Sequence, residues 1–338
     1  MFRCPTRRGR PARLGTVLLP LLLVGAASTA RAAQVEAKAD AKAAPAWRGS
    51  QLIYRNAVTA VSLDQSTDLT YDPTYEMTLA LQPRWYVWDQ LYVRAGASLS
   101  RELTESDWTT QSGEWIVGDT TLGFGSSQLW RVPVVETVFT ADLGVRLPTS
   151  KASRARTLLL AVEPRVGVSR TFDVLDGLTV AYGLVIARDF HDFTTGELTE
   201  PLVPGCVGGD TACDRFRNSG VRNTRARMSN SLSVSLGVLD WLAVGAGAGI
   251  HTHWLHDTSR IEGASFAVEP DTSTRHYLNY DLEATFLPVG GFSIGLGAST
   301  FNPQQQADSS DQDVFFNRFT ELFIDLRFEA AGLASLGD

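Results

Sequence analysis

The sequence predicts an all-β protein, an antiparallel up-and-down transmembrane β-barrel of about 12 strands. Three observations lead to this fold class. Apolar and polar residues alternate with period two over long stretches, as in half-exposed strands. Tight turns flanked by aromatic residues recur, and long polar connections separate them, because each strand of a membrane barrel must cross lipid and return. The tight turns lie within 85–96, 129–134, 172–180, 239–245 and 286–295.

Residues 1–32 are predicted to be a cleaved secretory signal peptide. Arginines precede the apolar run 17–27, and Ala30 and Ala32 form an Ala-x-Ala cleavage site. The alternative, a single spanning helix, needs roughly 20 apolar residues, and this run is shorter. Cleavage removes six of the 30 basic residues and leaves 24 against 37 acidic ones, a net charge of −13. An acidic, exported chain is not expected to bind nucleic acid.

The mature chain is predicted to form a single barrel between two short periplasmic segments. Residues 33–46, rich in Ala, Lys and Glu, are predicted to be a periplasmic linker, the barrel spans 47–329, and 330–338 form a C-terminal periplasmic tail. The predicted number of strands is even, as in bacterial single-chain barrels. The predicted strands are 47–61, 73–86, 90–101, 115–130, 134–146, 157–172, 177–191, 225–239, 241–254, 274–287, 291–301 and 317–329.

The alternation is clearest in the ninth of these segments. Leu242, Val244 and Ile250 share one face of 241–254, while the other face carries glycines and two histidines. A helix would spread these apolar residues around its whole surface, and each glycine would cost about 1 kcal/mol relative to alanine. A soluble β-sandwich also alternates, but so many strands with every tight turn on one side favour the barrel.

The lengths of the connections predict the two sides of the membrane. Short turns belong in the periplasm and long loops outside, which leaves both chain ends periplasmic. The long connections are 62–72, 102–114, 147–156, 192–224, 255–273 and 302–316. Aromatic residues beside the short turns are predicted to form a periplasmic girdle, namely Trp85, Trp88, Trp130, Phe172, Trp241, Phe286 and Phe292.

If the apolar face of each strand meets lipid, the polar face lines the lumen. Acids and arginines are mixed on this face, so they could form a ladder of ion pairs that holds the wall in shape, or a field that selects permeants, and both readings stay open. The candidate lumen-lining residues are Glu76, Arg84, Arg94, Glu136, Asp142, Arg146, Glu163, Arg165, His251, His253, Asp281, Glu283, Asp325 and Arg327.

Small residues fill much of the same face between 231 and 299. Examples are Gly245, Gly247, Gly249, Gly295 and Gly297. They leave space for water and solute, or a large group packs against them.

The cysteines and histidines suggest local structure more than chemistry. Cys206 and Cys213 are predicted to form a loop disulfide after export. His251 and His253 lie close enough on one face to share a metal ion, but histidines at a solvated barrel mouth are the favoured reading, so no metal or cofactor is predicted. We find no serine at a recognisable spacing from a histidine, and the sequence does not predict an enzyme.

Two segments resemble a known family. Residues 117–125 read Val-Gly-Asp-Thr-Thr-Leu-Gly-Phe-Gly, and 141–150 read Ala-Asp-Leu-Gly-Val-Arg-Leu-Pro-Thr-Ser. They resemble the outer-membrane transporter-like barrels of the "meta-pathway of phenol degradation" family, which have a Gly-Asp strand start and a hairpin ending in Gly-x-x-Leu-Pro-Thr-Gly. Ser150 stands where the family has its last glycine. The resemblance implies passive uptake of small, apolar or aromatic molecules and identifies no binding residue.

The sequence as a whole predicts a porin-like channel in the outer membrane of a Gram-negative bacterium, passing small solutes by passive diffusion. Its expected partners are outer-membrane lipid, a small-molecule solute and the barrel-assembly machinery. The alternative is a non-conducting barrel that acts as an envelope anchor or as the surface-binding component of a larger complex. Its loops would then bind an envelope protein partner or a surface.

Overall fold

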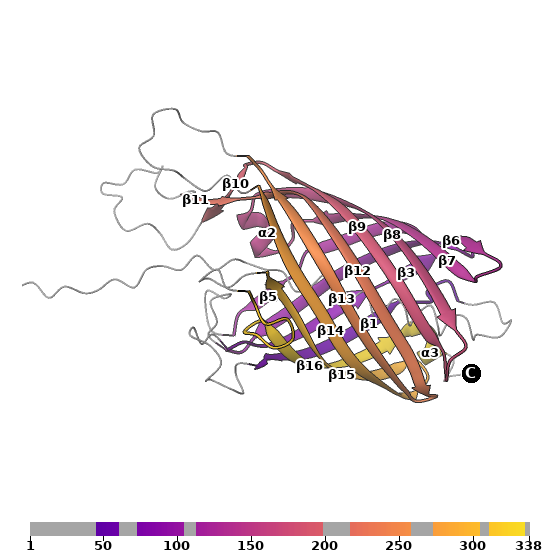
Figure 1. Ribbon diagram of the computed structural model, residues 1–338. Helices are drawn as coiled ribbons and strands as arrows, with labels where there is room; N and C mark the ends of the chain where they lie inside the picture. The colour runs from indigo at the N-terminus through magenta and orange to yellow at the C-terminus, as the bar shows by residue number, and fades with distance from the viewer. Residues whose placement is uncertain are drawn as a thin grey trace, which may run out of the picture.

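The chain forms one closed antiparallel β-barrel with obliquely running strands (Figure 1). The computed structural model describes residues 45–60, 73–104, 113–198, 217–257, 273–304 and 311–334. The predicted signal peptide, nearly all of the predicted linker, Cys206 and Cys213 lie outside the described residues.

Each wall strand pairs antiparallel with its neighbour in the chain, and the first strand pairs with the last to close the barrel. The described strands fill twelve positions around the wall, as predicted. They are β1 (Gln51–Thr59), β2 (Tyr75–Gln82), β3 (Arg84–Tyr86), β4 (Leu91–Glu102), β5 (Trp115–Val117), β6 (Thr120–Val132), β7 (Thr137–Leu147), β8 (Leu158–Phe172), β9 (Leu178–His191), β12 (Thr224–Leu239), β13 (Leu242–Leu255), β14 (Thr274–Val289), β15 (Phe292–Pro303) and β16 (Thr320–Glu329).

Two of the twelve positions are each filled by a pair of short strands. Pro83 separates β2 from β3, and both pieces pair with β4. Proline has no N–H to give to the ladder, which explains the break. Gly118 and Asp119 separate β5 from β6, and both of these pieces also pair with β4. The second break places the Asp119 carboxylate beside the wall without interrupting closure.

The two ends of the barrel differ, and we name them the short-turn end and the long-loop end. Tight turns join β6 to β7, β8 to β9, β12 to β13 and β14 to β15 at the short-turn end. Gly177 and Gly291 supply the positive φ, 103° and 77°, that such turns require. The Ala330 N–H donates to the Ser50 carbonyl at 3.0 Å, so both ends of the described chain also meet there.

Three smaller features do not belong to the wall strands and were not predicted. The connection between β7 and β8 contains the short helix α2 (Lys151–Ala155), with Ser150 as its N-cap. The connection between β9 and β12 contains a hairpin of β10 (Thr195–Leu198) and β11 (Arg217–Arg222), and α3 (Ala330–Ala334) follows the last strand. Within the described ranges, no helix is long and apolar enough to cross a membrane.

The predicted strand boundaries need small corrections. Residues 47–49, predicted as strand, form a turn ahead of β1, and residues 317–319 likewise precede β16. Glu136, predicted on a strand facing the lumen, lies in the tight turn before β7 with φ of 51° and is largely exposed, paired with Arg131. The turn needs a residue with positive φ there, and this takes Glu136 out of the alternating pattern.

Candidate functional site

The strands present an apolar outer face and a polar inner face. Leu143 on β7 is 51% exposed and Ile324 on β16 is 49% exposed, whereas their neighbours on the opposite parity, such as Asp325, are buried. The outer face carries exposed aromatic residues near the short turns, among them Trp130 and Trp241, which stack on Phe139 and Phe286. A polar interior inside an apolar exterior is the arrangement of a membrane barrel.

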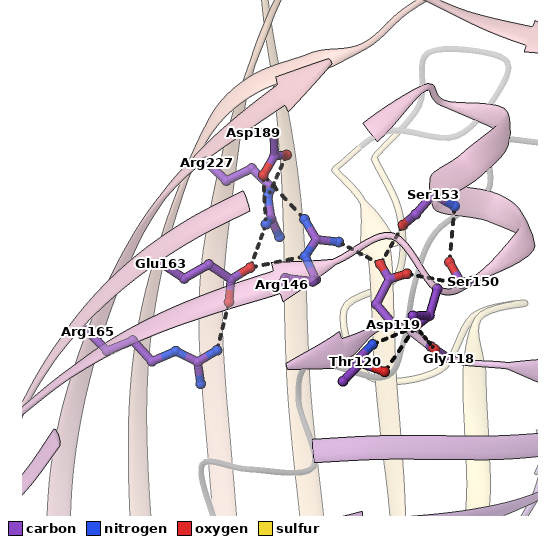
Figure 2. Close-up of polar contacts among 11 residues, drawn as sticks. Gly118, Asp119, Thr120, Arg146, Ser150, Ser153, Glu163, Arg165, Asp189 and Arg227 are labelled. Carbon is purple, nitrogen blue, oxygen red and sulfur yellow. Dashed lines mark hydrogen bonds and ion pairs between the residues drawn. The ribbon is translucent and has the colours of Figure 1, made fainter. Parts of the chain in front are cut away.

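Most predicted lumen residues form ion-pair networks on the inner face. The largest network, which we name the rim cluster, lies toward the long-loop end (Figure 2). Arg146 reaches Glu163 at 3.2 Å and Asp189 at 3.3 Å. Arg227 reaches the same two carboxylates at 2.9 and 3.1 Å. The rim cluster consists of Asp119, Arg146, Glu163, Arg165, Asp189 and Arg227.

The rim cluster spans the successive wall strands β7, β8, β9 and β12, and some of its ion pairs skip a strand. Glu163 on β8 is 2% exposed and accepts from arginines on β7, β8 and β12. Its third partner, Arg165, lies two residues along the same strand, at 2.8 Å. Because each buried charge has an opposite charge within hydrogen-bond reach, the desolvation cost of burying them is offset.

A second network, the seam ladder, crosses the point where the barrel closes. It consists of Arg55 on β1, Asp325 and Arg327 on β16, and Glu283 on β14. Arg55 and Asp325 are direct cross-strand partners and form two bonds of 2.7 Å. Arg327 donates to Asp325 at 2.7 Å and forms a bidentate pair with Glu283. The fully buried Asp325 therefore holds two arginines.

The glycines of the inner face make these long-reaching pairs sterically possible. Arg327 and Glu283 are separated by β15, where the inner residue is Gly295, and a Cβ there would lie 2.6 Å from Glu283 Oε1. Arg94 on β4 likewise pairs with Asp142 on β7 by crossing Gly123 on β6, where a Cβ would lie 2.9 Å from the guanidinium carbon. The sequence left open whether the small residues leave space for water and solute or whether a large group packs against them. At these positions the glycines accommodate packed side chains.

The predicted histidines have separate partners. His251 lies 2.8 Å from Ser229 Oγ and 2.7 Å from Asn279 Oδ1 through its two ring nitrogens. His253 packs on the ring of Tyr277 at 4.8 Å. Among the described residues no group of three or more metal-ligating side chains has the geometry to hold an ion.

Not every predicted lumen charge is paired. Glu76, Asp281 and the unpredicted Glu321 belong to the inner-facing parity of β2, β14 and β16 and form no ion pair in the part of the chain that the structure describes. Glu76 accepts a hydrogen bond of 2.8 Å from Thr78. Arg84, at the short-turn end, stacks over the Tyr92 ring at 4.6 Å. The unpaired carboxylates therefore lie on strands at or near the closure between β1 and β16, whereas Arg84 lies near the tight turns.

The sequence did not single out four of the networked residues. Arg55, Asp189 and Arg227 lie on the inner-facing parity of β1, β9 and β12, so a stricter reading of the alternation would have found them. Asp119 lies outside the strands, within the segment that carries the family resemblance. Only the fold shows that its carboxylate meets Arg146, 27 positions along the chain, at 3.3 Å.

Comparison with known proteins bears on the fold. No protein-family model matches the sequence, and no curated protein matches it. Among solved structures, an outer membrane channel from Pseudomonas putida F1 is similar with a TM-score of 0.52 and 12% identity, over 86% of this chain and 98% of that one. LpxR from Salmonella typhimurium is similar with a TM-score of 0.39 and 12% identity, over 82% of this chain and 99% of that one. The first similarity shows a shared barrel fold over nearly the whole length of that channel.

Proposed function

We propose that this protein is an outer-membrane channel through which small solutes diffuse passively. The observation that carries the proposal is the closed barrel with an apolar outer face and an inner face of charged, polar and small residues. Such a wall removes its strand edges from lipid and lines a polar interior. A barrel of about 12 strands encloses a narrow passage, not the wide pore of 16–18 strands, so the permeant is small.

The orientation and partners follow from the same proposal. The predicted signal peptide would deliver the chain to the periplasm, the barrel-assembly machinery would insert it, and the short turns would face the periplasm. Outer-membrane lipid would cover the apolar face. The segments at 117–125 and 141–150, which resemble a transporter-like family, support apolar or aromatic molecules as the solute class.

One observation favours the alternative of a non-conducting anchor. The rim cluster and the connection that carries α2 occupy inner-face positions at the long-loop end, where an open path would have to pass. A barrel closed at that end would present its loops to a partner without conducting. The two functions differ in one measurable property, which is conductance.

The test is single-channel conductance of residues 33–338 refolded into a planar lipid bilayer. A variant with 192–224 replaced by a short Gly-Ser link is measured beside it. Discrete conductance from the intact protein supports the channel. Conductance from the deletion variant alone indicates a closed or gated lumen, and silence from both contradicts the channel and favours the anchor.

Ion selectivity in the same bilayer then tests the lumen charges. Arg165→Glu reverses a charge that is 32% exposed at its side chain, more than the other arginines of the rim cluster. If Arg165 lines the path, the variant should increase the preference for cations while the barrel stays folded. Unchanged selectivity in a conducting variant would show that Arg165 only supports the wall.

A further inference from the structure

The connection between β7 and β8, residues 148–157, lies on the inner side of the barrel mouth, and we name it the strap. Ser150 and Ser153 of the strap are 3% and 5% exposed although they belong to a loop. Figure 2 shows the strap beside the rim cluster, with Asp119 between Arg146 and the helix. A connection that extended freely outward would leave these serines in solvent.

One carboxylate fastens the first half of the strap to the wall. Asp119 Oδ1 accepts the Ser150 N–H at 3.0 Å, and Asp119 Oδ2 accepts both the Ser153 hydroxyl and Arg146 Nη1. The Ser150 hydroxyl in turn accepts the Ser153 N–H at 3.0 Å and caps α2. Asp119 therefore connects the strap to the rim cluster by charge-assisted bonds, which are stronger than neutral ones.

A threonine reinforces this attachment. The Thr149 hydroxyl donates to the Gly118 carbonyl at 2.8 Å and accepts the Thr120 N–H at 2.7 Å. Residues 118–120 and 148–150 thus hold each other where β6 begins and β7 ends. These are the two segments in which the sequence showed its family resemblance, and their contacts give that pattern a structural role.

The second half of the strap is fastened on the other side, toward β9 and β12. The Arg156 carbonyl accepts from His191 Nδ1 at 2.7 Å and from Asn223 Nδ2 at 2.8 Å. Thr157 has a φ of 55°, uncommon for a β-branched residue, and its carbonyl accepts the Asp192 N–H at 3.0 Å. The strap is thereby held between the start of β6 on one side and the end of β9 and the residue before β12 on the other.

The Arg156 side chain is exposed to solvent but lies within electrostatic range of side chains on several wall strands. The side chains that act on the Arg156 guanidinium are Tyr277, Arg146, Arg227 and Asp189. Tyr277 belongs to β14, which is four wall positions from β8. A strap residue that lies among side chains of separate parts of the wall narrows the space between them.

We infer that the strap is the constriction that sets the size of solute admitted, and that Asp119 is the positioning residue that holds it inward. The inference rests on the proposed channel function. A loop fixed on both sides against the inner wall reduces the cross-section of the lumen, and the size limit of a pore follows its narrowest part. Arg146 keeps Glu163 and Asp189 when Asp119 is removed, so the wall does not depend on this one carboxylate.

The experiment measures conductance in potassium chloride and the exclusion limit for neutral polyethylene glycols of graded size. Asp119→Ala removes the attachment from the wall side, and Ser153→Ala weakens it from the strap side while leaving the Asp119–Arg146 pair in place. Ser127→Ala is the control, because it removes a serine hydroxyl that bonds a backbone carbonyl, that of Gln90, at the short-turn end. Heat-dependent electrophoretic mobility shows that each variant is folded.

The expected result is a larger exclusion limit and about a twofold higher conductance for Asp119→Ala, a smaller increase for Ser153→Ala, and no change for Ser127→Ala. If Asp119→Ala does not fold, the exclusion limits of Ser153→Ala and Ser127→Ala are compared, and a larger limit for Ser153→Ala supports the inference. Conduction by the intact protein with the same limit in the strap variants overturns the inference and leaves the channel in place. Silence from the intact protein and from every variant, including the 192–224 replacement, overturns the proposed function as well.

Discussion

The rim cluster and the seam ladder use the same residue types in different ways. In the rim cluster, arginines share acceptors, since Arg146 and Arg227 both bond Glu163 Oε1 and Asp189 Oδ1. In the seam ladder, Arg55 has both of its charged bonds on the two oxygens of Asp325. At the centre of the rim cluster, Arg146, Arg227, Glu163 and Asp189 each have more than one partner of opposite charge, whereas in the seam ladder Arg55 pairs with Asp325 alone among the described residues.

This difference matches what each region joins. The seam connects β1 and β16, which are far apart in the chain and meet only on closure, so a specific cross-strand pair fixes their register. The rim connects strands that already follow one another in the chain, and its shared bonds also support a loop. We expect the seam to be more important for stability and the rim for the shape of the lumen.

The largest expected effect is that of Asp325→Ala. It leaves Arg55 without an ion pair among the described residues, with the Phe323 ring 4.1 Å from its guanidinium, so we expect a loss of about 3–5 kcal/mol in unfolding free energy. Urea unfolding in lipid vesicles, followed by tryptophan fluorescence, measures it. The matched variant Asp189→Ala should cost less, because Arg146 and Arg227 both keep Glu163. Equal losses would show that the two networks do not differ in redundancy.

A smaller effect is expected from Gly295→Ala. The new Cβ would lie 2.6 Å from Glu283 Oε1 and 3.4 Å from Arg327 Nη2, so the bidentate pair must shift, at about 1–3 kcal/mol. Gly245→Ala is the control on the same inner parity, since its Cβ would meet only the Val234 carbonyl at 3.7 Å. The same unfolding assay compares them. If both substitutions lower the unfolding free energy equally, the Arg327–Glu283 pair does not require a glycine at position 295.

The smallest expected effect concerns charge selectivity on the seam side. Glu321 on β16 and Glu76 on β2 form no ion pair among the described residues, so Glu321→Gln should reduce the cation-to-anion permeability ratio by less than about twofold with little change in conductance. The reversal potential in a potassium chloride gradient measures the ratio. A stronger preference for cations in the variant would contradict a role for this carboxylate in attracting them.

Much of the fold could be predicted because alternation and turn length are local properties. The strands that contain Leu242 and Ile324 follow from the period-two alternation. The tight turns follow from residues such as Gly291 that allow positive φ. The prediction was wrong for Glu136 because a turn requirement overrode the strand parity there. Contacts across the strap, such as Asn223 with the carbonyl of Arg156, carry no periodic signal, so they could not be predicted.

A barrel of about twelve strands, the polar face of each strand and the places of the tight turns could be predicted from the sequence, since these features depend on neighbours two to four residues apart. Which charges meet depends on the closed fold. Arg55 finds Asp325 across 270 positions, and Asp119 joins Arg146 to the strap, because closure and register bring them within bonding distance. Pairing across a closed sheet depends on the whole ring of strands, and no local pattern contains that information.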